Sequence, residues 1–286
     1  MRVLLTIPHV FAPKEGSLYS SQTEAKRELK TKALRHATLY NLAKHQRASW
    51  IHASLGNAKP VITRGLSSKY FVDLHIQVYT SLSASLTGDI NSKEELEIID
   101  PGISDFTAIP SFAARRALEQ AADYDLVGYM EDDILIEDRE FFHKLAWLVH
   151  RSSVHYAFLP HRCENIPERG DVILSGDPDG GRPDLFWGTG EKLTFNWPTG
   201  QRHFYRATNP HSGCFFLTQE QALILRNHWQ SRRWIADYQL SGPLEQAASG
   251  MLLPIFKVMK PVPTDYRFFM VMHMDELWKR HPFENS

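Results

Sequence analysis

Cysteine is scarce in this sequence, which has two among its 286 residues, Cys163 and Cys214. Both lie in apolar surroundings, where a free buried thiol is more common than a disulfide, so we expect two free thiols. Long apolar runs are also missing. None approaches the roughly 18 residues that cross a bilayer, and the stretch before Pro8 is too short for a signal peptide. These absences favour a cytoplasmic protein.

Charge of one sign is missing too, because 32 basic and 33 acidic residues leave a net charge of −1. The chain therefore lacks the basic surplus of a protein that binds duplex nucleic acid. Charged residues make up 23% and hydrophobic residues 43%, the balance of an ordinary globular protein, and no internal repeat is visible. The length allows one large domain or two small ones, and we expect a single domain over 1–286.

The first half of the chain alternates predicted strands and helices. Strands are expected at 2–8, 72–80 and 126–130 from their apolar, β-branched character, and helices at 23–45 and from Pro110 onward. The apolar stripe of the first helix is expected at Leu29, Ala33, Ala37, Tyr40 and Ala43. This order is typical of an open α/β sheet, in which ligands bind beyond the carboxyl ends of the strands.

The next stretch of the chain begins with a predicted helix at 139–150. Glycines and aromatic residues then crowd the segment from 164 to 210, which predicts a β-ribbon or a loop-rich lobe. The remaining predicted elements are a strand at 213–218, a helix at 219–229, a short helix after Pro243 and a strand at 252–259.

Three consecutive acidic residues, Glu131, Asp132 and Asp133, follow the apolar strand at 126–130. Adjacent carboxylates repel one another unless water, a cation or cationic groups screen them. Mg²⁺ and Mn²⁺ prefer oxygen ligands and often complete their shells with diphosphate oxygens. The triplet therefore indicates a divalent metal site. The alternative is an acidic loop that merely precedes the helix at 139–150.

A helix with Ala114-Arg115-Arg116, followed by a strand that ends in the acidic triplet and then Ile134, resembles the glycosyltransferases of the GT-A type. The resemblance spans nearly the whole chain in element order and is specific at the triplet. It implies an α/β fold with a GT-A mixed sheet flanked by helices and a β-ribbon or loop acceptor lobe. Residues 1–150 would form the nucleotide-sugar half and residues 151–286 the acceptor half.

The resemblance also implies a separate role for each acid of the triplet. In the family the last acid binds the metal that bridges the donor diphosphate, which implies Asp133 here. The first acid usually contacts the nucleoside, which implies Glu131, with Asp132 as a supporting donor-site residue. A glutamate in first place departs from the usual DxD motif, so the role of Glu131 is less firmly implied than that of Asp133.

Many GT-A proteins use a histidine near the C-terminus as another metal ligand, and His273 matches it in order along the chain. Neutral imidazole suits Mn²⁺ better than Mg²⁺. His281 is a second candidate, and a structural or exposed histidine is the alternative. The resemblance therefore implies a metal held by Asp133 and His273.

The family also places a glycine-containing loop near the donor sugar, which Ser212 and Gly213 match loosely. The alternative is an ordinary turn into a buried strand. Pro8 and His9 end the first strand, where this fold usually holds the base. Arg115 or Arg116 could pair with the diphosphate or with Glu131, although helical arginines are mostly solvated.

Glu245 falls in the first turn of the short helix after Pro243. In inverting members of the family a carboxylate at this place deprotonates the acceptor hydroxyl, which is a poor nucleophile while it keeps its proton. The alternative is a helix-capping glutamate that does no chemistry. Asp237 is a second candidate for the base. Trp187 and Trp197 in the aromatic lobe form the predicted acceptor surface, with core packing as the alternative.

The expected function is glycosyl transfer from a nucleoside diphosphate sugar to a glycan or other hydroxyl acceptor, in an inverting displacement that depends on Mn²⁺ or Mg²⁺. One alternative is a nucleotidyltransferase acting on sugar phosphates, although residues 12–17 are a poor version of its glycine-rich basic loop. The other is a noncatalytic carbohydrate-binding protein on the same fold.

Overall fold

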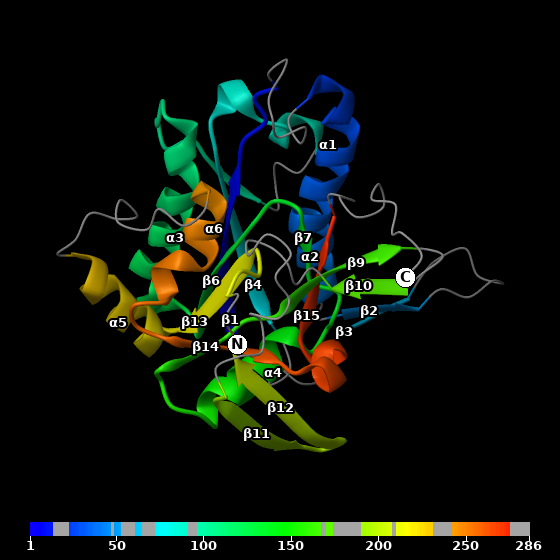
Figure 1. Cartoon of the computed structure of the whole chain (residues 1–286). Coiled ribbons are helices and arrows are strands. Elements are labelled where there is room, and N and C mark those ends of the chain that lie inside the picture. The colour runs from blue at the N-terminus through cyan, green and yellow to red at the C-terminus, as the bar shows by residue number, and fades with distance from the viewer. Residues whose placement is uncertain are drawn as a thin grey trace, which may run out of the picture.

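A five-stranded mixed sheet forms the centre of the computed structural model (Figure 1), which describes residues 1–13, 23–46, 49–52, 61–64, 72–90, 96–166, 170–173, 190–207, 210–230 and 242–274. The strands lie in the order β13-β6-β1-β4-β5. Their bounds are β1 Arg2–His9, β4 Asp73–Thr80, β5 Glu97–Ile99, β6 Leu126–Met130 and β13 Cys214–Thr218. β1, β4, β5 and β6 run parallel, and β13 runs antiparallel to β6 at one edge.

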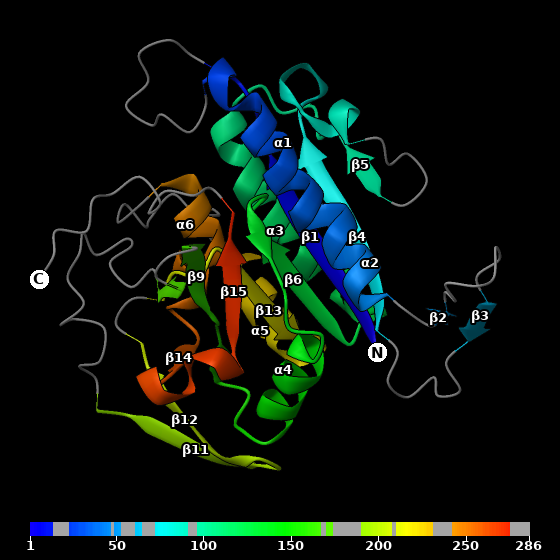
Figure 2. The ribbon, with the colours of Figure 1, turned by 90° about the vertical axis from the view of Figure 1, so that its right-hand side faces the viewer.

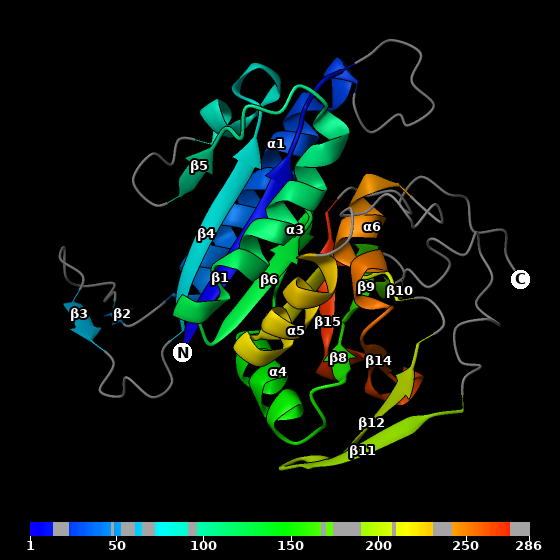
Figure 3. The same cartoon turned by 90° about the vertical axis from the view of Figure 1, so that its left-hand side faces the viewer.

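Helices cover both faces of this sheet. α1 and α2 lie over β1 and β4 on one face (Figure 2), whereas α3 lies on the opposite face with α5 and α6 beside it (Figure 3). Their bounds are α1 Arg27–Arg35, α2 Asn41–His45, α3 Ile109–Glu119, α4 Phe141–His150, α5 Gln219–Gln230 and α6 Pro243–Ala248. The predicted class, a mixed α/β sheet flanked by helices, is therefore confirmed.

The alternation of side chains along β1 explains why both faces need helices. Val3, Leu5 and Ile7 pack with α1 and α2 in one core cluster, whereas Leu4 packs with α3 in a second. Each of these side chains is fully buried, and burying one contributes about 1.5–3 kcal/mol. A strand that is buried on both faces can be stable only between two helical layers.

Two smaller sheets complete the described part of the chain. One has the order β10-β9-β15-β7, and the other the order β11-β12-β14-β8. Their bounds are β7 Ile134–Leu135, β8 Tyr156–Phe158, β9 His161–Ile166, β10 Gly170–Ile173, β11 Lys192–Trp197, β12 Gly200–Arg206, β14 Lys257–Pro261 and β15 Met270–His273. β2 (Ser49–His52) and β3 (Val61–Arg64) form a separate antiparallel pair.

The helix predicted at 23–45 is present, but its inward face differs from the predicted stripe. Tyr40 is 50% exposed and Ala43 is also exposed, so these two predictions are wrong. A π-helical turn at His36–Tyr40 lies between α1 and α2, and its wider turn rotates the residues that follow. The buried positions recur in pairs every four residues, at 33 and 34, 37 and 38, and 41 and 42, and position 45 is buried as well.

Several other sequence predictions can be compared with the structure. The β-ribbon of the aromatic lobe is present as β11 and β12, whereas residues 174–189, with Trp187, lie outside the described residues. The strand predicted at 252–259 begins at Lys257, because the residues before it form helical turns. Both cysteines are free and buried, as predicted. Among the described helices, none is long and apolar enough to cross a membrane.

Gly128 in β6 provides a test of the contact between the central strands. A Cβ atom at this position would meet the ring of Phe216 and lie 2.7 Å from the carbonyl oxygen of Phe215 on β13. We expect Gly128→Ala to lower the free energy of unfolding by about 1–3 kcal/mol, because overpacking forces the strands apart. Urea unfolding followed by circular dichroism measures this change.

Gly88→Ala is the matched control, since a Cβ atom at Gly88 has no neighbour within 4 Å. Equal stability of the two variants would contradict the tight β6–β13 contact.

Candidate functional site

The acidic triplet lies directly after β6, at the carboxyl edge of the parallel strands. His9 ends the neighbouring strand β1, and its Nδ1 lies 2.5 Å from Asp132 Oδ2. The backbone N–H of Leu86 donates to His9 Nε2 at 2.9 Å, so Nε2 is an acceptor and Nδ1 carries the hydrogen that Asp132 accepts. Both nitrogens of the buried His9 ring are thus engaged, and Pro8 beside it is buried as well. Their predicted contact with a donor base stays a prediction.

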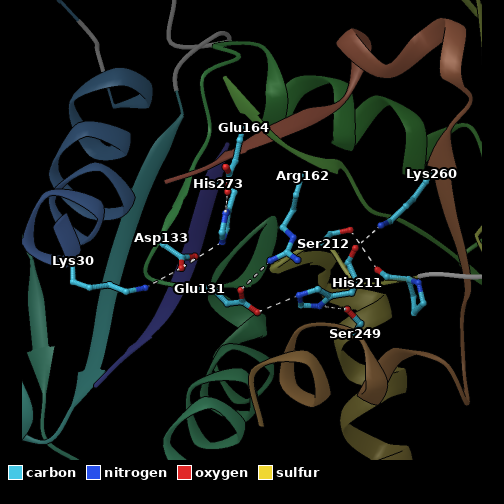
Figure 4. A network of polar contacts seen from close by, with 11 residues as sticks. Lys30, Glu131, Asp133, Arg162, Glu164, His211, Ser212, Ser249, Lys260 and His273 are labelled. Carbon is cyan, nitrogen blue, oxygen red and sulfur yellow. Dashed lines mark hydrogen bonds and ion pairs between the residues drawn. The ribbon is translucent and has the colours of Figure 1, made fainter. Parts of the chain in front are cut away.

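The register of β7 and β15 brings Asp133 and His273 together. Ile134 pairs with His273 across these antiparallel strands, and the N–H of Met274 donates to the carbonyl of Asp133 at 2.8 Å. As a result His273 Nε2 lies 3.6 Å from Asp133 Oδ2, with both side chains buried (Figure 4). The two residues implied as metal ligands therefore face one another.

Glu164 on β9 fixes the orientation of the His273 ring. Its Oε1 lies 2.7 Å from His273 Nδ1, and the Glu164 side chain is 1% exposed. A carboxylate at Nδ1 accepts the hydrogen of that nitrogen and leaves the lone pair of Nε2 directed at Asp133. This carboxylate–histidine arrangement is common behind metal-binding histidines.

A divalent cation fits the chemistry of this pair. Asp133 Oδ1 is buried and has no hydrogen-bond partner, which is costly for a carboxylate oxygen. Within the described residues, no group of three or more His, Cys, Asp and Glu side chains is arranged to hold a metal ion. Asp133 and His273 would thus supply two ligands, and water or phosphate oxygens would have to complete the shell.

Lys30 on α1 also reaches this carboxylate, with its Nζ 3.6 Å from Asp133 Oδ2. Burial raises the pKa of Asp133, but its electrostatic interactions with His273, Lys30 and Arg162 outweigh this effect, so that the pKa lies below its usual value. Asp133 is therefore ionised at neutral pH and available to a cation.

Glu131 has a different environment from Asp133. Arg162 Nη1 lies 3.6 Å from its Oε2, and His211 Nε2 lies 3.8 Å from its Oε1. All three side chains are buried. Burial raises the pKa of Glu131 to about 8, against the opposing charge of Arg162. The two ends of the triplet thus differ in protonation, because Asp133 has more cationic neighbours.

The segment from Pro210 to Gly213 lies against the triplet. Gly213 has a positive φ of 64°, and its carbonyl accepts the N–H of Glu131 at 2.8 Å. A Cβ atom on Gly213 would lie 2.9 Å from Ile134 Cδ1, so a glycine is required for this close approach. Ser212 is fully buried and its hydroxyl donates to the carbonyl of Pro210. Gly213 therefore contacts the triplet, and the donor-sugar role of Ser212 and Gly213 stays a prediction.

Two buried side chains hold this segment in place. The ammonium of Lys260, which is 2% exposed, donates to the carbonyl of His211. His211 Nδ1 lies 3.3 Å from the hydroxyl of Ser249, just after α6. The segment is thereby tied to both β14 and α6.

Glu245 lies in the first turn of α6, which packs against α3 and β6. Its Oε2 lies 2.7 Å from the position of a Cβ atom on Gly242, so the carboxylate folds back over the start of the helix. Besides burial and the Asp133 charge, the negative charge of Glu245 raises the pKa of Glu131, so it acts on the site electrostatically. Its role as a base stays a prediction.

Other predicted residues lie apart from the triplet. Arg116 pairs with Glu119 at 2.7 Å, and Arg115 pairs with Glu119 too, whereas Arg162 is the arginine beside Glu131.

The Trp197 ring packs edge-to-face on Trp147 and Phe268, which supports the core-packing alternative. Asp237 and His281 lie outside the described residues.

Sequence reasoning missed five residues that contact the site: Lys30, Arg162, Glu164, His211 and Lys260. Arg162 and Glu164 alternate along β9 and therefore share one face of that strand. Two charged residues on one face of a strand could have indicated from the sequence that this face borders a polar site. Lys30 offered none, because lysines occur along the whole of its helix.

No protein-family profile matches the chain, and no curated protein matches it in sequence. Among solved structures, the chain is similar to residues 1–349 of TarS from S. aureus, with 14% identity and a TM-score of 0.46. This match covers 91% of the chain but only 58% of that TarS structure. The chain is also similar to 4-diphosphocytidyl-2C-methyl-D-erythritol synthase from Anaerococcus prevotii, with 7% identity and a TM-score of 0.40, over 97% and 96% of the two chains.

The pH dependence of stability tests the environment of Glu131. Its pKa rises from 4.5 in the unfolded chain to about 8 in the folded protein, so between these values the folded state binds the extra proton. The stabilising contribution is present below about pH 4.5 and is lost as the pH rises towards about 8. We therefore expect wild-type protein, in chelator-containing buffer, to lose stability relative to Glu131→Gln across this window.

Urea unfolding of both proteins at pH 5, 6, 7 and 8 measures the difference. Parallel stability profiles would contradict the raised pKa.

Proposed function

We propose that this chain is a metal-dependent glycosyltransferase of the GT-A type, which uses a nucleoside diphosphate sugar as donor. The observation that supports the proposal most is the convergence of Asp133 and His273 at the carboxyl edge of the parallel strands. Nucleotides bind at this edge in open α/β sheets. The orphaned Asp133 Oδ1 supports a cation there.

The proposed metal is Mn²⁺ or Mg²⁺, held by Asp133 and His273. When bound, such a cation neutralises the charge that develops on the leaving diphosphate. Glu164 keeps the His273 ring in its ligating orientation. Asp132, which is 21% exposed, is fixed by His9 and faces the same edge of the sheet as the ligand pair.

The other proposed donor contacts come from both halves of the chain. Glu131 is proposed to contact the nucleoside, and Ser212 and Gly213 to border the donor sugar. Pro8, His9 and Arg116 stay proposed donor-site residues. The single domain over 1–286, with a donor half at 1–150 and an acceptor half at 151–286, belongs to the same proposal. Arg162, Glu164, His211 and His273 of the second half all contact the triplet side chains or their partners.

The proposed chemical step is an inverting displacement at the anomeric carbon of the donor sugar. The acceptor hydroxyl forms the new glycosidic bond while the bond to the diphosphate breaks, and Glu245 takes the proton of that hydroxyl. The half-buried position of Glu245 and its electrostatic effect on Glu131 support this role. The acceptor is a glycan or another hydroxyl compound.

A nucleotidyltransferase acting on sugar phosphates is the second candidate, because a lysine of the helix that follows the first strand, Lys30, reaches the carboxylate edge. The two reactions differ in their products. A nucleotidyltransferase releases pyrophosphate from a nucleoside triphosphate and a sugar phosphate, whereas a glycosyltransferase releases a nucleoside diphosphate from the sugar donor. A noncatalytic carbohydrate-binding protein releases neither.

Asp133→Asn tests the metal site. We expect the release of nucleoside diphosphate from a panel of UDP, GDP and dTDP sugars, in the presence of Mn²⁺, to fall by about 10²- to 10³-fold in kcat/KM. Chromatographic measurement of the released nucleotide gives the rate.

Asp123→Asn is the matched control, because Asp123 is exposed at the opposite end of β6. Full activity of Asp133→Asn would overturn the metal assignment. Release of pyrophosphate from a nucleoside triphosphate would instead support the second candidate.

Glu245→Gln tests the base. We expect kcat to fall by about 10²- to 10⁴-fold with little change in KM for the donor, because the variant cannot accept the acceptor proton. Steady-state kinetics with a glycan acceptor panel measure both constants.

Glu220→Gln is the control, since Glu220 occupies the first turn of α5 just as Glu245 occupies the first turn of α6. A helix-capping role predicts equal losses of stability and no loss of kcat in both variants, and that result would remove Glu245 as the base.

A further inference from the structure

Lys30 is a cation placed where the proposed metal would bind. Its Nζ lies 3.6 Å from Asp133 Oδ2, the same oxygen that faces His273 Nε2 at 3.6 Å (Figure 4). The Lys30 side chain is 14% exposed and the Asp133 side chain 12% exposed, so water screens this pair only weakly. In the protein without ligands, Lys30 therefore compensates the charge of Asp133.

A divalent cation on Asp133 cannot leave Lys30 in place. Two unit positive charges about 4 Å apart already repel by about 4 kcal/mol at an effective dielectric constant of 20, and a divalent ion doubles this repulsion. The ammonium must move away when the carboxylate takes the cation. Its four-carbon stem allows such a movement without any change in α1.

The displaced ammonium of Lys30 would find a new negative partner in the phosphates of a bound nucleotide. A nucleoside diphosphate that shared the cation would bring phosphate oxygens to the edge of the sheet where Lys30 lies. A lysine ammonium with three donors binds phosphate as a point charge. Lys30 would thereby exchange a carboxylate for phosphate oxygens and keep a negative partner in both states.

We propose that Lys30 is a diphosphate-binding residue, which holds Asp133 in the free protein and transfers to the phosphates of the nucleotide when a divalent cation occupies Asp133. This assignment rests on the proposed function, since it requires a nucleoside diphosphate and a cation at the site. It adds to that function a residue of α1 and an order of events, in which the cation must displace Lys30.

Two effects of opposite sign distinguish this role from that of a simple counterion. Without Lys30, Mn²⁺ alone should bind about three- to tenfold more tightly, because one competing charge is removed. In saturating Mn²⁺, UDP, GDP, CDP or dTDP, whichever binds wild-type protein, should bind about ten- to a hundredfold more weakly, because one hydrogen bond to a charged group is lost. A simple counterion of Asp133 produces the first effect without the second.

Isothermal titration calorimetry on Lys30→Met measures both affinities, since methionine keeps the apolar stem and helix propensity of lysine. Lys32→Met is the matched control, because Lys32 is exposed on another face of the same helix, and it should bind both ligands as the wild type does. Lys30→Arg keeps the charge at this position and should retain nucleotide affinity within a few-fold, which guards against a folding defect in Lys30→Met.

Unchanged nucleotide affinity in Lys30→Met, or Mn²⁺ binding that is no tighter than in the wild type, would overturn the Lys30 assignment alone. Wild-type protein that binds none of the four nucleotides with Mn²⁺ would overturn the proposed function together with it.

Discussion

Three adjacent carboxylates at the end of a buried strand impose the constraint on which the site depends. Burying a carboxylate without a partner is costly, and neighbouring charges of the same sign increase the cost. The fold meets this constraint by giving each acid its own partner from a different element. Asp132 has His9 of β1, Asp133 has Lys30 of α1 and His273 of β15, and Glu131 has Arg162 of β9. The triplet therefore ties together elements from distant parts of the chain.

The registers of β7, β9 and β15 determine which side chains lie next to the acidic triplet. β15 pairs with β7 directly after the triplet and with β9 on its other side. Because side chains alternate along a strand, the partners on the site-facing side are Arg162, Glu164 and His273, while Cys163 and Met272 pack together on the other side. A shift of one residue in the β15–β7 pairing would bring a methionine side chain to Asp133 in place of the His273 ring.

Much of the fold could be predicted from local sequence patterns, whereas much of the site could not. The continuous apolar runs of β1 and β6 and the apolar face of α3 are visible in the sequence. The parallel order of the two strands fixes which edge of the sheet carries the triplet. The π-helical turn before Asn41 could not be predicted, because it depends on tertiary bonds. The Asn41 side chain donates to the carbonyl of Ala37 and accepts the N–H of Ile136. Likewise, the pairing of Glu164 with His273 requires long-range strand registers that no short sequence window contains.

The balance of charge at the site bears on how ligands can enter it. With Glu131 protonated at neutral pH, the network contains three other carboxylates, Asp132, Asp133 and Glu164, and three basic side chains, Lys30, Arg162 and Lys260. A divalent cation alone would add two positive charges to this nearly neutral group, and the diphosphate of a sugar donor alone would add two negative charges. Either change leaves uncompensated charge in a buried place, which is strongly unfavourable. Cation and donor together add no net charge, so the electrostatics of the site favour their joint binding, and Lys30 is the cation proposed to change partner as they arrive.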